Sequence, residues 1–124
     1  MKKILFAASE ALPFASTGGL ADVIGSLPAA LCKAGLDVRV AMPLYSAIDE
    51  KYRSEMEFVC AIRVRLSWRN QYCGIFKTVR SGVTFYFLDN EYYFKRISMY
   101  GNYDDGERYA FFCRALLDML PYID

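Results

Sequence analysis

The N-terminal part of the chain carries two hydrophobic patterns in succession. Lys3–Ala8 is almost continuously apolar, which is typical of a central strand in a parallel sheet that is buried on both faces. Apolar residues then recur at helical spacing, which predicts an amphipathic helix over Leu20–Leu31 with a buried face made of Leu20, Val23, Ile24, Leu27 and Leu31. Asp37–Met42 forms a second apolar run, closed by Pro43. Together these segments predict a right-handed βαβ unit.

Two features refine the predicted helix. Pro28 lies inside it and has no N–H to donate to the carbonyl of Ile24, so a kink or a local break is expected there. Gly35 suits the C-terminal cap, and Lys33 complements the helix dipole at that end.

The middle of the chain changes to a period of two. Apolar and polar residues alternate in Glu57–Trp68, which is typical of a half-exposed strand. Arg69-Asn70 is predicted to form a turn into Gln71–Val79, and Arg80–Gly82 a turn into Val83–Leu88. These segments predict antiparallel strands, or a β-hairpin followed by a return to the main sheet.

A last helix is predicted to begin near Asp104 or Asp105 and to end at Pro121 or just before it. Its buried face is expected to hold Tyr109, Phe112, Cys113, Leu116, Leu117 and Leu120. No further parallel strand follows it, so we expect an unfinished sheet. An open sheet edge favours self-association.

Composition and charge favour a globular domain and give no sign of a nucleic-acid-binding or membrane protein. The chain has 124 residues, of which 55% are hydrophobic and 23% charged, as in a globular domain or a piece of one. A net charge of +1 gives no reason to expect nucleic acid or a membrane surface as a partner. No apolar run approaches the roughly 20 residues that span a bilayer, and Glu10 and Pro13 interrupt the N-terminal run too early for a signal peptide.

Histidine is absent from the chain, and this limits its chemistry. A Ser-His-Asp triad, histidine acid–base catalysis and histidine-ligated metals are excluded within these residues. The cysteines form no C-x-x-C pair and are interpreted as small buried apolar residues, with disulfides as the alternative; they are Cys32, Cys60, Cys73 and Cys113.

The turn Ser16–Gly19 joins the first strand to the first helix and is a candidate anion site. The first N–H groups of a helix lack intrahelical partners and attract negative charge. Gly18 and Gly19 have no Cβ atoms to hold a phosphate or a sugar away from that backbone. The alternative is a tight turn without a ligand, because neither G-x-G-x-x-G nor a P-loop is complete.

Longer segments carry a more specific signal. Lys3–Pro28 and Asp37–Pro43 resemble the start of bacterial and plant-type glycogen (starch) synthases, and Phe87–Phe94, Tyr100-Gly101 and Asp105–Phe112 continue the resemblance. It implies an α/β fold with a Rossmann-like parallel sheet and an antiparallel β-hairpin insertion. Residues 1–124 would be the incomplete N-terminal half of a two-domain GT-B glycosyltransferase.

The resemblance also implies an activity. Such an enzyme transfers glucose from ADP-glucose, with retention, to the non-reducing end of an α-1,4-glucan such as glycogen, without a metal or another cofactor. It is cytoplasmic, and its catalytic histidine lies in a part of the family sequence that these residues do not include. This fragment is therefore expected to be inactive alone. The alternatives are a non-catalytic glucan-binding module and a nucleotide-binding half-domain.

Residue roles follow from the same resemblance. Asp22 matches a position beside the active site, although its own placement also suits simple complementation of a helix N-terminus. Ser16, Thr17, Gly18 and Gly19 match the segment that meets ADP-glucose. Ser16 stands where the family usually has lysine, so one positive charge is missing at the diphosphate.

Acidic and aromatic residues near the carboxyl ends of strands are further candidates. Glu10 is expected to bond either a loop N–H or a sugar hydroxyl. Asp89 and Glu91 resemble an Asp-x-Asp metal clamp, but an acidic turn is the commoner interpretation. Among the crowded aromatic residues, Tyr92, Tyr93 and Tyr100 are candidates for sugar contact or for packing against an absent domain.

Overall fold

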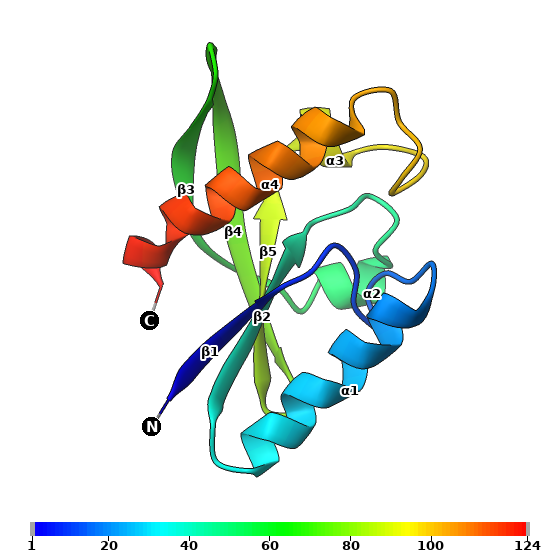
Figure 1. The fold of residues 1–124 in the computed structure, drawn as a ribbon, viewed down its shortest axis with the longest axis vertical. Helices are drawn as coiled ribbons and strands as arrows, with labels where there is room; N and C mark the ends of the chain where they lie inside the picture. The colour runs from blue at the N-terminus through cyan, green and yellow to red at the C-terminus, as the bar shows by residue number, and fades with distance from the viewer. Residues whose placement is uncertain (1, 124) are drawn as a thin grey trace.

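The computed structural model describes residues 2–123, in which a single mixed sheet carries helices on both faces (Figure 1). The elements in chain order are β1 (Lys3–Ala7), α1 (Gly19–Lys33), β2 (Asp37–Pro43), α2 (Glu50–Arg53), β3 (Glu57–Leu66), β4 (Arg69–Arg80), β5 (Val83–Asp89), α3 (Glu91–Phe94), α4 (Asp105–Met119) and the 3-10 turn η1 (Leu120–Tyr122). Within these residues, no helix combines the length and the apolarity that crossing a membrane requires.

The sheet has the strand order β1-β2-β5-β4-β3. β1, β2 and β5 are parallel, with Val40 opposite Phe85, whereas β4 runs antiparallel to β5 and β3 antiparallel to β4. This confirms the predicted parallel sheet and the hairpin inserted between its second and third strands. Among the described residues β1 pairs only with β2 and leaves one edge of the sheet open, so the central position of the first strand in a complete sheet stays a prediction.

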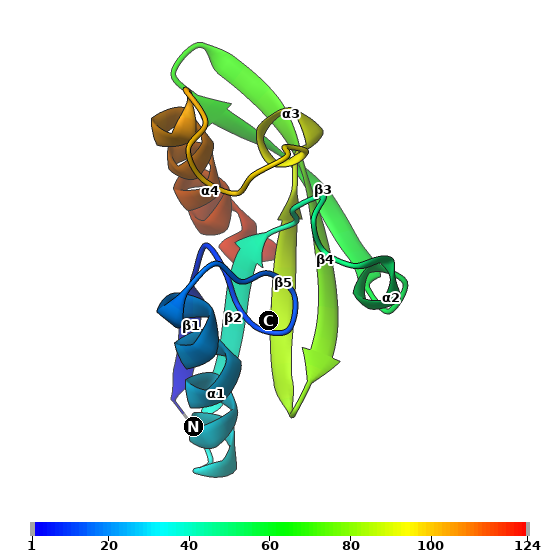
Figure 2. The same cartoon turned by 90° about the vertical axis from the view of Figure 1, so that its right-hand side faces the viewer.

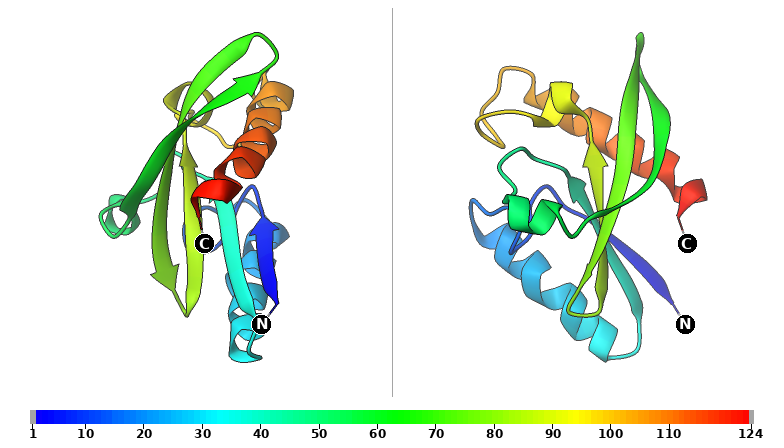
Figure 3. Two further views of the ribbon diagram at one scale, coloured as in Figure 1. Left: turned by 90° about the vertical axis from the view of Figure 1, so that its left-hand side faces the viewer. Right: turned by 180° about the vertical axis from the view of Figure 1, so that it is seen from behind.

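Helices α1 and α4 cover opposite faces of this sheet. Figure 2 shows α1 nearer the viewer and α4 behind it, and the left view of Figure 3 reverses the order. Ile24 of α1 and Phe85 of β5 line one small cavity, whereas Leu120 and Arg39 line another at the end of α4. Since side chains alternate along a strand, both faces of the parallel strands contribute to the core.

The buried face of α1 differs from the predicted one. Of the five residues expected in the core only Ile24 is buried, and it is joined there by Ala21 and Pro28. The loop after β1 docks on this stripe of small residues: the Leu12 N–H donates to the carbonyl of Ala21 at 3.1 Å. A Cβ atom at Gly25 would lie 2.9 Å from the Leu12 Cβ atom, so the close approach requires glycine.

As a consequence, the larger apolar residues of α1 face outward. Leu20, Val23 and Leu27 are exposed, with 49% of Val23 accessible to solvent. The helix also continues through Pro28, so the local break that was expected does not occur. Its C-terminal end agrees with prediction: Gly35 follows with a positive φ of 95°.

Helix α4 is likewise rotated from its predicted orientation. Its buried residues are Arg108, Phe111, Phe112, Ala115 and Met119. Tyr109 and Leu116 are partly buried, while Cys113, Leu117 and Leu120 are exposed, contrary to prediction. The cause is Arg108, which turns inward and donates to the main-chain carbonyls of Tyr93 and Met99.

The four cysteines are all free thiols. Cys73 is buried and Cys32 and Cys60 are partly buried, in agreement with their interpretation as apolar residues. Cys113 is the exception, because it lies on the exposed side of α4. Burial raises the pKa of Cys73 to about 12, so this thiol stays protonated at neutral pH.

Candidate functional site at the carboxyl ends of the parallel strands

The loops that follow β1, β2 and β5 meet at one edge of the sheet, since the three strands run in the same direction. Open α/β sheets bind their ligands at this edge. The turn Ser16–Gly19, Glu10 and the segment Asp89–Glu91 all lie there. The structure therefore brings the predicted site residues to one end of the fold.

The loop after β1 is anchored by Phe14. Its ring makes edge contacts with Phe85 and Phe87 of β5 at centroid distances of 5.0 and 4.9 Å, and with Tyr52 at 5.4 Å. Phe14 is buried in the core, whereas the next residues, Ser16–Gly19, are exposed. The aromatic anchor thus fixes an exposed turn on a rigid base.

Glu10 holds the turn from inside. Its carboxylate is only 2% exposed and accepts bonds from the Thr17 N–H at 3.3 Å, the Gly18 N–H at 3.2 Å and the Thr17 hydroxyl at 2.6 Å. The Tyr100 hydroxyl donates to the same carboxylate at 2.8 Å. Burial by itself would raise the pKa of Glu10, but these bonds outweigh it and the pKa is lowered.

This arrangement corrects one expectation about the turn. The N–H groups of Thr17 and Gly18 point to Glu10, so they are not free for an anion. Glu10 accepts loop N–H groups here, which is one of the two partners expected for it, and contact with a sugar hydroxyl stays a prediction. Helix α1 begins at Gly19, and its N-cap residue, Gly18, has no side chain to bond the first N–H groups of the helix. The N–H groups without a capping side chain therefore begin with that of Gly19.

The surface around the turn is open. An added Cβ atom at Gly18 or Gly19 would meet no described atom within 4 Å. Asp22 is exposed in the first turn of α1, and its carboxylate makes no hydrogen bond or ion pair with residues 2–123. Ser16, six residues before Asp22, is also exposed. These groups are accessible to a ligand that approaches the start of α1.

A network of hydroxyl groups connects the loop after β1 with the segment before α4. The Ser9 hydroxyl lies 2.6 Å from the Tyr100 hydroxyl, and the Tyr45 hydroxyl donates to the carbonyl of Ser9 at 2.6 Å. Tyr45 also lies 2.9 Å from the hydroxyl of Tyr109, which donates to the Met99 carbonyl at 2.7 Å. Since Tyr100 donates to Glu10, the Ser9 hydroxyl donates to Tyr100.

Sequence reasoning missed most of this network. Tyr45 and Ser9 are separated by 36 residues and Ser9 and Tyr100 by 91, so no local pattern joins them. Burial raises the pKa of Tyr100 to about 12 and that of Tyr45 further, so both hydroxyls stay protonated at neutral pH. The network holds the three loops in one arrangement.

Tyr93 lies in the interior. It is fully buried, its ring packs on Phe111 at a centroid distance of 4.7 Å, and its hydroxyl donates to Glu107. Burial raises the pKa of this hydroxyl, and the bond to Glu107 adds to the effect. A sugar does not reach a side chain in this position, so the structure gives Tyr93 a packing role.

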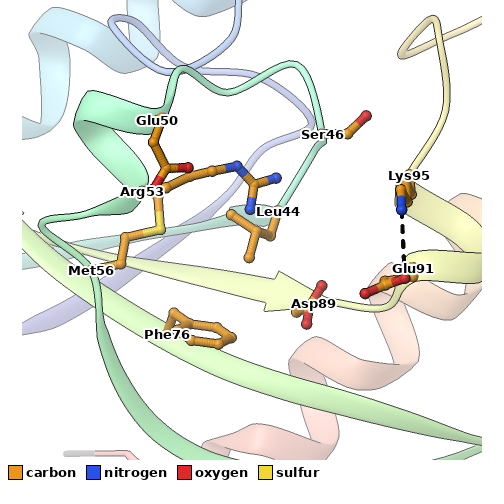
Figure 4. Close-up of a pocket in the computed structure, with 9 residues that line it drawn as sticks. All are labelled: Leu44, Ser46, Glu50, Arg53, Met56, Phe76, Asp89, Glu91 and Lys95. Carbon is orange, nitrogen blue, oxygen red and sulfur yellow. Dashed lines mark ion pairs between the residues drawn. The ribbon is translucent and has the colours of Figure 1, made fainter.

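A cavity of about 450 Å³ opens between β2, β4, β5 and α2 at the carboxyl ends of the strands (Figure 4). Leu44, Ser46, Glu50, Arg53, Met56, Phe76, Asp89, Glu91 and Lys95 line it. Burial and the neighbouring Glu91 raise the pKa of Asp89. Arg53 is already committed, since it donates to the carbonyls of Ile48 and Tyr45.

The segment Asp89–Glu91 joins the end of β5 to the start of α3. Asn90 caps α3 by accepting the Tyr93 N–H at 3.0 Å, and its amide donates to the Tyr72 carbonyl at 2.8 Å. Glu91 pairs with Lys95 at 4.0 Å. Among residues 2–123, no three histidine, cysteine or acidic side chains group so as to hold a metal ion. Asn90 and Glu91 thus have partners within the chain, as in an acidic turn, and the metal clamp stays untested.

Comparisons with known proteins show which family the chain belongs to. A family model described as the starch synthase catalytic domain matches residues 3–124. The chain is 57% identical over 122 residues to a glycogen synthase of Anoxybacillus flavithermus and 60% identical over 122 residues to one of Clostridium kluyveri. Each alignment covers 98% of this chain but only 25% and 26% of the relative, so the chain spans about a quarter of their length.

A solved structure shares the fold. The catalytic domain of starch synthase IV from Arabidopsis thaliana, bound to ADP and acarbose, superposes with a TM-score of 0.84 at 25% sequence identity. The match covers 97% of this chain and 25% of that chain. It therefore includes the sheet, the helices and the loops at the carboxyl ends of the strands.

Proposed function

Because the chain belongs to the starch synthase catalytic domain family, we propose that it forms the N-terminal part of a two-domain GT-B glycosyltransferase of the glycogen synthase type. The whole enzyme would transfer glucose from ADP-glucose, with retention, to the non-reducing end of an α-1,4-glucan. A cytoplasmic location belongs to the same proposal. The observation that carries it is the family match over residues 3–124 together with an exposed glycine turn at the ligand-binding edge of the sheet.

The proposed donor site lies at the start of α1. The diphosphate would meet the N–H groups from Gly19 onward, where the helix dipole favours negative charge. Ser16 adds a single hydroxyl donor. The N–H groups of Thr17 and Gly18 act indirectly, because their bonds to Glu10 fix the shape of the turn.

Asp22 is proposed to bind hydroxyl groups of the transferred glucose. Its carboxylate is exposed, lies in the first turn of α1 and has no partner among residues 2–123, so both oxygens are free to accept. A carboxylate that only complemented the helix dipole would contribute about 0.3–1 kcal/mol to stability and nothing to turnover. Asp22→Asn in the full-length protein separates the two roles: we expect a large loss of kcat with little change in melting temperature.

The direct test of the activity uses labelled ADP-glucose with glycogen as acceptor. The full-length protein is expected to transfer glucose, whereas the 124-residue chain alone is expected not to, because much of the catalytic constellation lies outside it. Transfer by the rigorously purified 124-residue chain at the rate of the full-length protein would contradict the proposal that catalysis needs residues outside this chain.

The donor site itself is tested by Ser16→Lys in the full-length protein. An ion-assisted bond to diphosphate adds roughly 1.5–3 kcal/mol, which corresponds to about 10- to 150-fold tighter binding of ADP-glucose in calorimetric titration. Ser26→Lys is the matched control, because it adds the same charge at an exposed position farther along α1. Equal dissociation constants for Ser16→Lys and the unmodified protein would show either that another cation already fills this role or that the turn does not face the diphosphate.

A further inference from the structure

The backbone just after Tyr100 is bonded to the start of α4. The Asp105 carboxylate accepts the Gly101 N–H at 2.7 Å and the Asn102 N–H at 3.2 Å. Gly101 has a positive φ of 83°, a conformation that glycine adopts without strain. Asp105 also pairs with the fully buried Arg108 at 2.9 Å, so its carboxylate is fixed from the helix side as well.

The backbone just before Tyr100 is bonded to the same helix. The Met99 carbonyl accepts the Arg108 guanidinium at 2.8 Å and the Tyr109 hydroxyl at 2.7 Å. The Tyr109 ring lies beside that of Tyr100, at a centroid distance of 5.8 Å. Because α4 already fixes this backbone on both sides, little conformational entropy is left to lose when the Tyr100 hydroxyl forms its own bonds.

Tyr100 carries this constraint to the turn before α1. Its hydroxyl donates to one oxygen of Glu10 at 2.8 Å, and the same oxygen accepts the Thr17 hydroxyl at 2.6 Å. The other oxygen of Glu10 accepts the N–H groups of Thr17 and Gly18. The hydrogen bonds therefore run without a gap from Asp105 through the Tyr100 segment and Glu10 to the turn.

We propose that Asp105 is a positioning residue for the turn Ser16–Gly19 and that it acts through Tyr100 and Glu10. Among residues 2–123 the Asp105 carboxylate makes no hydrogen bond or ion pair with the turn itself, so its effect passes through these two side chains. The start of α4 would in this way set the direction of two N–H groups at the start of α1. That a nucleotide sugar responds to this change rests on the proposed function, whereas the effect on the turn does not.

Asp104 provides a matched control for this role. It is the N-cap residue of α4, so its charge complements the helix dipole as that of Asp105 does. Its carboxylate bonds to Arg96 at 2.8 and 2.9 Å and, in the described structure, to none of residues 99–102. A carboxylate that only stabilised the start of α4 would therefore act alike at both positions.

The first measurement is hydrogen exchange of the full-length protein, followed by mass spectrometry on peptides that contain the turn. Asp105→Asn keeps the shape of the side chain but replaces one acceptor oxygen by an NH₂ group, so bonds to the Tyr100 segment are lost. We expect the Thr17 and Gly18 amides to exchange roughly 2- to 30-fold faster, the range for residues that act on a site through packed contacts. Asp104→Asn should leave their exchange unchanged.

A double-mutant cycle tests the route through Tyr100. Tyr100→Phe removes the hydroxyl that reaches Glu10, so Asp105→Asn should have no further effect on exchange at the turn in this background. Equal acceleration in both backgrounds would overturn the proposal. Tyr109→Phe frees the Met99 carbonyl from one of its two bonds and should act in the same direction. Unchanged exchange in Asp105→Asn, or in Tyr109→Phe where Asp105→Asn does not fold, would also overturn the proposal.

Binding and transfer assays separate this inference from the proposed function. If both hold, Asp105→Asn weakens ADP-glucose binding in calorimetric titration and leaves KM for glycogen unchanged. Exchange at the turn that responds to Asp105→Asn, in a full-length protein that neither binds ADP-glucose nor transfers glucose, would support the positioning role and overturn the proposed function. Transfer by a protein whose turn and ADP-glucose affinity do not respond to Asp105→Asn would do the reverse.

Discussion

Replacement of Glu10 tests the idea that one buried carboxylate sets the shape of the turn before α1. Its two oxygens accept different donors: one takes the N–H groups of Thr17 and Gly18, and the other takes the hydroxyls of Thr17 and Tyr100. Glu10→Ala removes all four acceptor contacts. Glu10→Gln keeps the side-chain shape, and its amide can direct the oxygen to the two N–H groups and the NH₂ to the hydroxyls, which are able to accept.

The expected magnitudes follow from this difference. A hydrogen bond to a charged group contributes about 1.5–3 kcal/mol, and bonds that share one acceptor do not add. Thr17 and Gly18 are exposed, so water replaces part of what they lose. We therefore expect Glu10→Ala to lower the free energy of unfolding by about 2–4 kcal/mol and Glu10→Gln by about 1–2 kcal/mol. Glu55→Ala, which breaks an exposed pair with Arg80, is the control and should cost no more than about 1 kcal/mol.

The assay is urea unfolding followed by circular dichroism, repeated between pH 7 and pH 3. Because the pKa of Glu10 is lowered in the folded state, its ionised form stabilises the fold above the ordinary pKa of 4.5. That contribution is lost as the pH falls through the folded-state pKa. The difference between the unmodified chain and Glu10→Gln should therefore shrink below pH 4.5. A difference that stays constant with pH, or a Glu10→Ala effect no larger than that of Glu55→Ala, would refute the reasoning.

Three other predictions follow from packing and exposure. Arg108→Met should lower the free energy of unfolding by about 2–4 kcal/mol in urea titration, because it removes the bond to the Tyr93 carbonyl and one of the two bonds to the Met99 carbonyl, and leaves Asp105 without its ion pair; an unchanged midpoint would contradict this role. A thiol reagent such as DTNB should modify the exposed Cys113 at once and the buried Cys73 only after denaturation, and equal rates would contradict the described packing. The isolated 124-residue chain should dimerise or aggregate at micromolar concentration through the unpaired edge of β1, whereas a monomer by light scattering with a sharp, high melting transition would refute this.

The order of the elements could be predicted because hydrophobic period is a local property. The alternating segment Glu57–Trp68 indicated a strand, and β3 spans Glu57–Leu66; the strand expected over Val83–Leu88 is β5, Val83–Asp89. The strand–helix–strand pattern predicted that β1 and β2 are parallel, and the resemblance to the synthase family supplied the larger parallel sheet to which β5 belongs. Pairing partners need contacts across the sequence, and therefore the edge position of β1 was not evident from the apolar run itself.

The faces of the helices could not be predicted because α1 has two apolar stripes. The large residues Leu20, Val23 and Leu27 form one, and the small residues Ala21, Gly25 and Pro28 form part of the other. Hydrophobicity favours the first stripe, but the loop after β1 docks where the backbone can approach closely, and that is the second. In α4 the buried Arg108 has the same effect, since a charged residue in the core is not expected from its hydropathy.

The hydrogen bonds of the site were likewise only partly predictable from the sequence. The turn Ser16–Gly19 could be recognised from its glycines, but the sequence could not show that Glu10 already occupies the N–H groups of Thr17 and Gly18. With those two donors committed, any diphosphate bound at this turn depends on the N–H groups from Gly19 onward and on side chains. Ser16 contributes a hydroxyl where the family usually supplies a cation, so this part of the site is short of positive charge. If the turn faces the diphosphate, as proposed, other basic side chains of the full-length protein would supply the balance, and the Ser16→Lys titration tests whether they already do.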